Sequence, residues 1–559
     1  MTGIGRALLP VAGLGLALGA PAGAVVTADA GAVAASAYVR ARAAEAMGEL
    51  ETSAAGYATA LAVVPGDPLL ATRSYRQALA AGDQALAVKA ARVLEAADKL
   101  PADARLLLLV DDVNAARWPA AARQIDAIAQ DKLFAFLVPV MRAWVAYCAR
   151  QGDALAALSP ASLEGIAGAT PYLGEHRALM LLARGRYDDG IAAVRAQAGP
   201  SGGPSARLRI VAAGILQRGR RSEQALALLT GDEPPVTAAR ATIEAGGKLQ
   251  PQPFGARDGL AELFLRLAAD IDRQRITPLA LGMARLATFV APDNDAAWLA
   301  TGSVLAGADR GAAALQALDR VRPGPYAEGA RIARLRVMVR QGDKQEALAV
   351  VKADAARPDA TAAEWTRLGD LLTDLDRDAE AADAYARALA LAEAAGAPAA
   401  ERWPLLLLMG GAREQAGQWP EAQAALQKAI ALAPDQPVVL NYLGYAKLER
   451  REDLPQARAL IERASKLRPD DPSITDSLGW SYYLTGDVGP AIAALEKAVA
   501  GDPAQATINE HLGDAYWTAG RRYEARYAWR AALVSADEKE TARLRGKIDA
   551  GLTPATRAP

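Results

Sequence analysis

His511 is the residue of this 559-residue chain with the clearest catalytic potential. Asp514 follows it by three positions, so the two side chains share one face of a helix. Ser477 stands at the equivalent place one sequence repeat earlier, which would complete a Ser-His-Asp hydrolase set. A histidine that makes a polar contact between repeats explains the same residues more simply. We therefore expect no catalytic residue and no enzymatic activity.

Other site chemistry has little support in the sequence. Cys148 is the single cysteine, and His176 is the other of two histidines, so neither a disulfide nor a four-ligand zinc cluster is expected. We expect Cys148 to be a small buried residue of an apolar helix over 138–150, and His176 to be exposed at the start of a helix. Phosphate-loop and dinucleotide-binding motifs are not found in the sequence, so no metal and no cofactor is predicted.

Composition points to closely packed helices. Lys and Arg number 63 and Asp and Glu 64, a net charge of −1 that argues against nucleic acid as a partner. Hydrophobic residues make up 52% of the chain but aromatic residues only 5%, so much of the apolar content is alanine. Alanine favours helices, whereas strands are enriched in β-branched and aromatic residues.

An internal repeat occupies the last third of the chain. An apolar residue followed by glycine recurs every 34 or 35 residues, at 409–410, 443–444, 478–479 and 512–513. Alanines follow each at fixed offsets, and prolines close three of the units. The spacing predicts two helices per unit, with Gly444 and Ala457 where they cross and no room for a larger side chain. Large residues are expected to fill the space between neighbouring pairs: Leu426, Ile461, Leu495 and Trp529.

This pattern resembles the tetratricopeptide repeat (TPR) family, with five well-formed units over 362–537. The resemblance implies an all-α, right-handed solenoid, and looser copies upstream bring the total to about 13 to 14 helix pairs. We expect degenerate repeats over 25–235 and 258–358, separated by a linker or hinge at 236–257 that is rich in proline and glycine. A capping helix is predicted at 538–552, before a tail at 553–559.

The family resemblance also implies a concave groove lined by the first helix of each pair. The matching positions in the three most regular units carry aromatic, acidic and amide side chains, spaced i, i+4, i+7 along each helix. Such a surface suits a neutral or basic extended peptide, because acidic side chains would repel a carboxylate. The predicted partner-binding residues are Asn441, Tyr445, Asp476, Trp480, Tyr483, Glu510, Asp514 and Trp517.

The N-terminus resembles a secretory signal peptide. Arg6 precedes an uncharged apolar stretch over 7–18, and Ala22 and Ala24 are small residues of the kind that signal peptidase reads. We expect cleavage of residues 1–24, a mature chain that begins at Val25, and a periplasmic location, with the cytoplasm as the alternative. Since no cysteine follows the apolar stretch, a lipid anchor is not expected, and no membrane span is predicted after signal removal.

A non-enzymatic scaffold or adaptor is the function that these features favour. The repeats resemble long TPR proteins of Gram-negative envelopes, which include adaptors of carboxyl-terminal processing proteases. The resemblance implies a protein or extended-peptide partner, such as an envelope protease or an assembly factor. Four alternatives stay open: a cytoplasmic scaffold, a repeat-bearing enzyme such as a glycosyltransferase, a component of polysaccharide export, and a peptide-sensing transcription regulator. The last three each need a further domain that the sequence pattern does not indicate.

Overall fold

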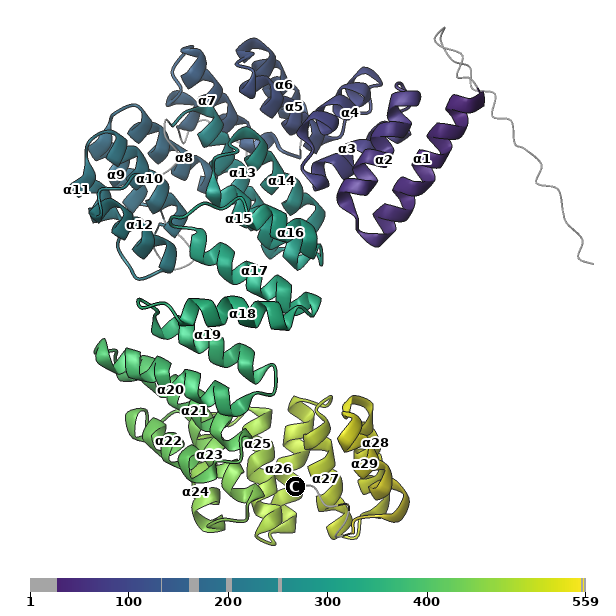
Figure 1. The fold of residues 1–559 in the computed structure, drawn as a ribbon, viewed down its shortest axis with the longest axis vertical. Helices are drawn as coiled ribbons and strands as arrows, with labels where there is room; N and C mark the ends of the chain where they lie inside the picture. The colour runs from purple at the N-terminus through teal and green to yellow at the C-terminus, as the bar shows by residue number, and fades with distance from the viewer. Residues whose placement is uncertain are drawn as a thin grey trace, which may run out of the picture. The chain divides into compact units, whose positions relative to one another are not determined.

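The computed structural model describes residues 28–131, 133–159, 170–197, 204–249, 254–553 and 556. Within these residues the chain forms 29 α-helices and two short 3₁₀ turns, and no strand (Figure 1). The predicted all-α array of about 13 to 14 helix pairs is thus confirmed. The predicted signal peptide and its cleavage site lie outside the described residues.

The chain divides into two compact units, 1–341 and 342–559. The described helices of the N-terminal unit are α1 (Ala28–Met47), α2 (Leu50–Val63), α3 (Pro68–Ala81), α4 (Gln84–Ala96), α5 (Ala102–Asn114), α6 (Trp118–Gln130), α7 (Val138–Ala149), α8 (Thr170–Ala183), α9 (Tyr187–Arg195), α10 (Ala206–Arg218), α11 (Ser222–Leu228), α12 (Pro234–Glu244), α13 (Ala256–Arg273), α14 (Thr277–Val290), α15 (Asp295–Gly307), α16 (Gly311–Leu318) and α17 (Ala327–Gln341).

The C-terminal unit contains α18 (Lys344–Ala355), α19 (Ala362–Thr373), α20 (Asp378–Ala394), α21 (Ala399–Gln415), α22 (Trp419–Leu432), α23 (Pro437–Glu449), α24 (Leu454–Leu467), α25 (Pro472–Leu484), α26 (Val488–Gly501), α27 (Ala506–Thr518), α28 (Arg522–Ser535) and α29 (Glu538–Ala550). Pairs α19–α20 to α27–α28 correspond to the five predicted repeat units, and α29 lies within the range predicted for the cap.

Small residues let the two helices of each C-terminal pair approach closely. A Cβ added to Gly444 would lie 2.6 Å from Ile461 Cγ1, and one added to Gly479 would lie 2.6 Å from Leu495 Cγ. The glycines therefore sit at the helix crossings, as predicted. The large residues were expected to fill the space between neighbouring pairs. Ile461 and Leu495 instead pack against the glycine of their own pair. Leu495 also joins a cluster with Leu512 of the next pair, so it contributes to both contacts.

The N-terminal unit folds back onto itself. Helix α14 packs against α3 and α5, and α13 packs against α5, α7 and α8 (Figure 1). Hydrogen bonds tie these distant segments together: Arg285 Nη2 donates to the carbonyl of Ala80 over 2.9 Å, and Asn114 Nδ2 donates to that of Phe289 over 2.9 Å. In TPR-like arrays the first helices of the pairs form the inner face. In this unit the α13–α14 hairpin covers that face.

The predicted linker at 236–257 differs from the structure. Helix α12 covers its first part and buries Val236, Ala239 and Ile243, while α13 begins at Ala256. Prolines at the start of α12 are compatible with a helix, because the first turn needs no N–H donor there. The division between compact units falls instead between Gln341 and Gly342.

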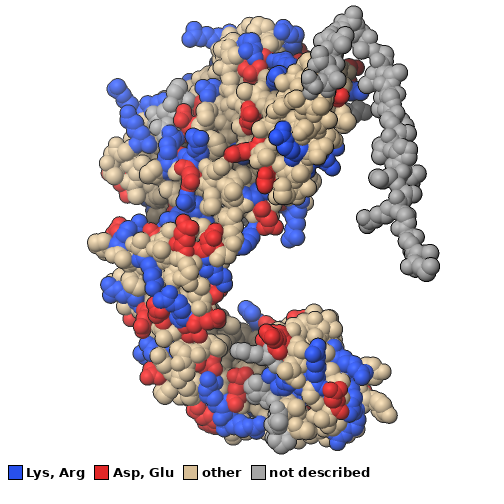
Figure 2. Space-filling model, turned by 45° about the vertical axis from the view of Figure 1, so that its right-hand side comes forward, with Lys and Arg blue, Asp and Glu red and all other residues tan. Residues whose placement is uncertain are grey.

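None of the helices in the described ranges is both long enough and apolar enough to cross a bilayer. Acidic and basic side chains are interspersed on the visible surface, in keeping with the near-zero net charge (Figure 2). The face seen in Figure 2 thus offers no extended field of one sign to attract a polyanion.

Candidate partner-binding groove

A cavity of about 390 Å³ opens on the first helices of the C-terminal pairs. We call it the inner groove. Its lining comes from the end of α21, from α23 and α25, from the start of α27 and from the turn that precedes α27. These four helices are the first helices of successive repeats. The residues are Glu414, Gln415, Asn441, Tyr442, Tyr445, Ala446, Glu449, Ser473, Asp476, Ser477, Gln505, Thr507 and Ile508.

Three of the eight predicted partner-binding residues line this groove: Asn441, Tyr445 and Asp476. The Oδ1 atom of Asn441 is buried and has no hydrogen-bond partner within the described part of the chain. A buried amide oxygen without a partner is costly, so an N–H group of a bound segment would be favoured there. The predicted amide and aromatic character of the surface is therefore present, over a smaller set of residues.

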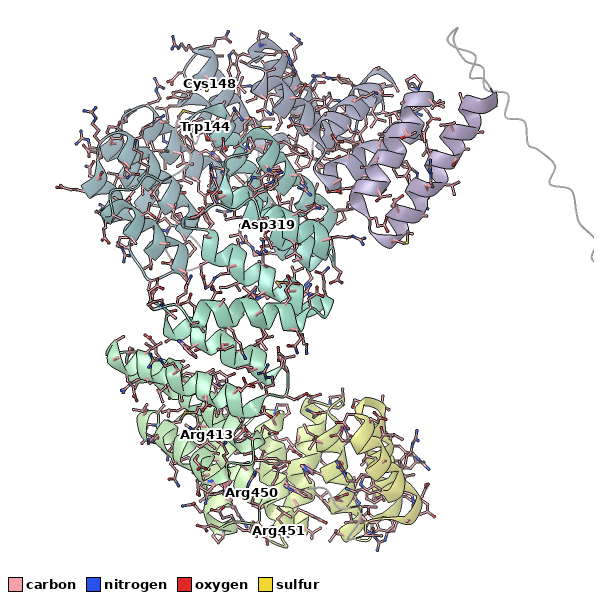
Figure 3. The ribbon with its side chains drawn as sticks, viewed as in Figure 1. Trp144, Cys148, Asp319, Arg413, Arg450 and Arg451 are labelled. Atoms are coloured by element: carbon pink, nitrogen blue, oxygen red, sulfur yellow. The ribbon has the colours of Figure 1, made fainter. Side chains whose placement is uncertain are left out.

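The inner groove is acidic. Burial and the neighbouring Glu414 raise the pKa of Glu449, although the Tyr445 hydroxyl and Arg450 oppose that shift. Arg450, labelled in Figure 3, also pairs with Glu414 over 2.7 Å. The Tyr442 hydroxyl donates a further hydrogen bond to Glu414 over 2.8 Å. Arg450 thus partly neutralises these carboxylates from outside the groove, and a basic or neutral ligand would gain most from them.

Trp480 and Tyr483 are not the exposed aromatic platforms that the helical spacing predicted. Trp480 is only 2% exposed and stacks between Tyr483 and His511, with ring centroids 4.7 and 4.0 Å away. Tyr483 is half-buried and its hydroxyl lies 3.1 Å from the Thr518 hydroxyl. The prediction was wrong for Trp480 because the next repeat supplies an imidazole that covers its ring.

His511 makes the polar contact between repeats that the sequence favoured. Its Nδ1 lies 3.0 Å from both carboxylate oxygens of Asp476, one repeat earlier, rather than near Asp514. Burial alone would lower the pKa of His511, but the carboxylates of Asp476, Asp514 and Glu510 outweigh it and raise the pKa. Ser477 donates its hydroxyl to the Ser473 carbonyl over 3.0 Å. The residues therefore do not form the geometry of a hydrolase triad.

Glu510 and Asp514 are buried in an ionic cluster that holds α29, the helix predicted as a cap. Nζ of Lys547, which is fully buried on α29, lies 2.7 Å from Glu510 Oε1 and 2.7 Å from Asp514 Oδ1. Arg543 makes two further hydrogen bonds of 2.7 Å to Glu510. These two acids are therefore not partner-facing, which corrects the prediction. One feature of the sequence does indicate this contact. Arg543 and Lys547 are spaced i, i+4, as are Glu510 and Asp514, so two basic and two acidic side chains can face each other across the helices.

Trp517 packs against α28, next to this ionic cluster and away from the inner groove. Its ring is half-buried, packs 5.3 Å from that of Trp529, and lies under the guanidinium of Arg522 at 3.8 Å. It takes no part in the inner groove. Of the predicted surface, Asn441, Tyr445 and Asp476 come together, and the other five residues serve packing between helices.

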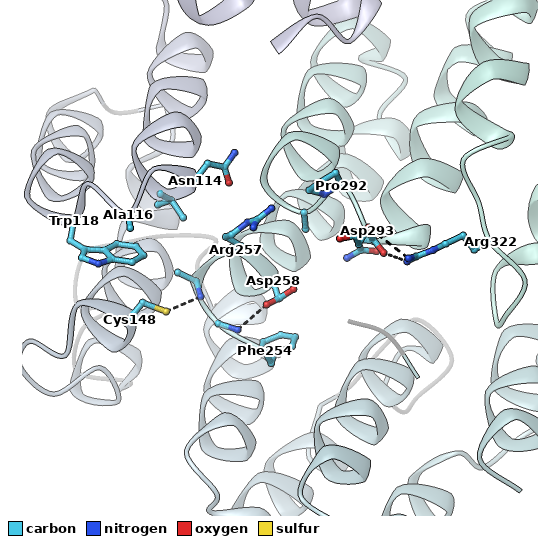
Figure 4. A pocket seen from close by; sticks show the side chains of 15 residues that line it. Asn114, Ala116, Trp118, Cys148, Phe254, Arg257, Asp258, Pro292, Asp293 and Arg322 are labelled. Carbon is cyan, nitrogen blue, oxygen red and sulfur yellow. Dashed lines mark hydrogen bonds and ion pairs between the residues drawn. The ribbon is translucent and has the colours of Figure 1, made fainter. Parts of the chain in front are cut away.

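A second cavity, of about 600 Å³, lies in the N-terminal unit (Figure 4). It forms where the start of α13 meets the ends of α5 and α7, so it exists only because the α13–α14 hairpin returns. Cys148 is half-buried in its wall, where Sγ accepts a hydrogen bond from the Ala256 amide over 3.1 Å. Burial raises the pKa of this thiol. Cys148 is thus less buried than predicted, and its environment is not that of a reactive thiolate.

His176 is buried, which corrects the prediction that it is exposed. Its Nδ1 accepts a hydrogen bond of 3.0 Å from the indole N–H of Trp144, which is labelled in Figure 3. Burial lowers the pKa of His176 to about 3, and the guanidinium groups of Arg207 and Arg266 contribute. The imidazole is therefore neutral, and it is part of a polar core. Over the ranges the structure describes, no group of three or more His, Cys, Asp or Glu could hold a metal ion.

The sequence matches no protein-family model and no curated protein. Solved structures with a similar fold include a TPR protein of Thermus thermophilus (22% identity, 34% of this chain and 98% of that chain, TM-score 0.29). They also include a TPR protein of Parabacteroides merdae (14%, 53% and 99%, 0.35) and the APC/C hetero-tetramer Cut9–Hcn1 (15%, 82% and 98%, 0.35). These likenesses concern the helical-repeat fold alone and include TPR proteins, the family that the repeat pattern resembles.

Proposed function

We propose that the protein is a non-enzymatic TPR scaffold that binds an extended, neutral or basic segment of a partner protein in the inner groove. One observation carries this proposal: the first helices of the C-terminal unit enclose an open cavity lined by Glu414, Glu449 and Asp476. In the N-terminal unit the corresponding face is covered by α13 and α14. Among the described residues, the first helices of the C-terminal unit thus offer an inner face that is open to a ligand.

The ligand chemistry follows from the lining. The carboxylates favour Lys or Arg side chains, and the unpartnered Asn441 oxygen favours a peptide N–H. Tyr445 adds a rigid, half-buried aromatic surface beside them. A site of this kind selects a peptide by charge and by backbone, not by one deep pocket.

We further propose a periplasmic location for the mature protein, and a role as an adaptor in envelope biogenesis or proteolysis. The apolar leader and the repeat resemblance support this part of the proposal. N-terminal sequencing of protein from the native host tests it, because a chain that begins at Val25 is expected. Recovery of an intact N-terminus would move the protein to the cytoplasm.

A peptide array tests the groove directly. Full-length protein is applied to extended decapeptides of matched apolar content that carry lysine, serine or glutamate at alternate positions. Binding should fall in the order lysine, serine, glutamate. Glu449→Lys should weaken binding of the lysine series by about tenfold or more, since it reverses a charge in the groove.

Glu462→Lys is the matched control, because Glu462 lies on α24, a second helix outside the groove. It should leave the array unchanged. A preference for the glutamate series, or equal effects of the two variants, would count against the inner groove as the binding site.

A further inference from the structure

The outer face of α28, the second helix of the last pair, carries an exposed apolar stripe. Tyr523 is 81% exposed, Tyr527 is 69% exposed and Val534 is 88% exposed. With the exposed Arg530 they are spaced i, i+4, i+7, i+11, which places all four on one helix face. We call these four residues the α28 stripe. Large exposed side chains that gather on one face indicate an interaction surface.

Repeat packing does not require these side chains. The equivalent positions in the two preceding repeats are small, polar or proline. On α26 they are Gly489, Ala493, Glu496 and Ala500, and on α24 they are Pro455, Ala459, Glu462 and Lys466. The stripe is therefore a feature of the last repeat and not of the repeat pattern, so it needs an explanation of its own.

Arg530 has no carboxylate within ion-pair distance in the described part of the chain. Its guanidinium lies 5.9 Å from the centre of the Tyr527 ring. A cation of this kind is best satisfied by an acidic group or by the face of an aromatic ring. The stripe thus combines an exposed guanidinium, without a carboxylate partner among the described residues, with two exposed tyrosine rings that attract cations.

The order of residues in the stripe is self-complementary. Suppose that two copies of α28 pack antiparallel through their outer faces, about a two-fold axis that crosses the helix at the level of Ala528 and Trp529. Tyr523 then lies opposite the partner's Val534. The same axis places Tyr527 opposite the partner's Arg530. Both contacts then occur twice, as an isologous interface requires. Each tyrosine gains either a cation or an aliphatic surface from the partner, and each Arg530 gains the partner's Tyr527 ring in addition to its own.

We propose that the α28 stripe is a homodimer interface and that its occupant is α28 of a second copy. A contact of one helix with one helix is smaller than the 1,200–2,000 Å² or so that stable interfaces bury. The dimer should therefore be weak, with a dissociation constant on the order of micromolar.

Sedimentation velocity of the full chain over about 1 to 100 µM tests this, since that range spans the expected dissociation constant. Wild-type protein should shift from monomer to dimer. Tyr527→Arg places two guanidinium groups opposite each other, and should raise the dissociation constant at least about tenfold. The swap Tyr527→Arg with Arg530→Tyr restores tyrosine opposite arginine across the axis, and should recover most of the affinity.

Ala424→Arg is the matched control, because Ala424 occupies on α22 the position that Tyr527 holds on α28, and it is also exposed. It should dimerise as wild type does. Circular dichroism melts establish that each variant is folded.

Three results would overturn the proposal: a monomer over the whole range, a dimer that Tyr527→Arg leaves intact, or a swap variant as weak as the single variant. A monomer that binds vesicles of phosphatidylcholine and phosphatidylglycerol through the stripe would also overturn it, and would assign the surface to membranes.

Discussion

Acidification should destabilise the N-terminal unit through one side chain, His176. The folded unit keeps the imidazole neutral, with a pKa of about 3, whereas an exposed histidine titrates near 6.5. The folded pKa is thus below the unfolded one, and on acidification the unfolded state takes up a proton that the folded state does not. Stability is therefore fully present above about pH 7 and decreases as the pH falls through 6.5.

The magnitude follows from the same two values. At pH 5, about 1.5 units below the ordinary value, the loss is about 2 kcal/mol, because one pKa unit corresponds to 1.36 kcal/mol. Since the Trp144 N–H occupies Nδ1, the folded state has no easy route to accept the proton. Arg207 and Arg266, from α10 and α13, disfavour a cation at this place as well.

Hydrogen exchange of the α7 and α8 amides, read by mass spectrometry, measures this loss. After correction for the intrinsic pH dependence of exchange, protection in wild type should fall between pH 7.5 and pH 5. This fall should be about 30-fold larger than the fall in a His176→Asn variant. Asn keeps an acceptor for the Trp144 indole and removes the titrating ring. An identical pH dependence in wild type and variant would refute the buried, neutral histidine.

Three further predictions follow from contacts in the C-terminal unit. The pKa of His511 is raised, so its contribution to stability is present below pH 6.5 and is lost as the pH rises through the folded pKa. The α25 and α27 amides should therefore lose protection as the pH is raised above 6.5 in wild type, but not in His511→Asn. Gly479→Ala should lower the free energy of unfolding, measured by urea denaturation, by about 1–3 kcal/mol, because the added Cβ would crowd Leu495. Gly489→Ala, with open space around it, should not lower it. Lys547→Met should cost about 3–5 kcal/mol and make α29 sensitive to limited proteolysis, and partial rescue is expected when Glu510→Gln and Asp514→Asn are added.

The periodic part of the structure could be predicted because each repeat encodes its own contacts. Gly479 and Leu495 lie in one unit, so their spacing along the chain carries the information on the helix crossing. Asn441, Tyr445 and Asp476 were found in the same way, as one face of successive first helices. Local spacing thus predicts which residues share a face of a helix.

Local spacing does not show what covers that face. Trp480 lies on the expected side of α25, but His511 from the following repeat stacks on its ring. The acids of α27 also lie on the expected side, and Lys547, 33 residues beyond Asp514, neutralises them. In the N-terminal unit the second cavity depends on Cys148 meeting Ala256 across 108 residues. Contacts of this range leave no periodic signal in the sequence.

Helix α28 carries both a contact that seats α29 and the stripe of the proposed self-association. On one side of α28, Arg526 donates a hydrogen bond of 2.9 Å to the Ile548 carbonyl and so helps to seat α29. At the next position Tyr527 points away and is exposed. Beyond the last pair, α29 packs on α28 and buries Lys547 against Glu510 and Asp514. Association through the outer face of α28 then closes on itself about a two-fold axis, which yields a dimer and not a filament.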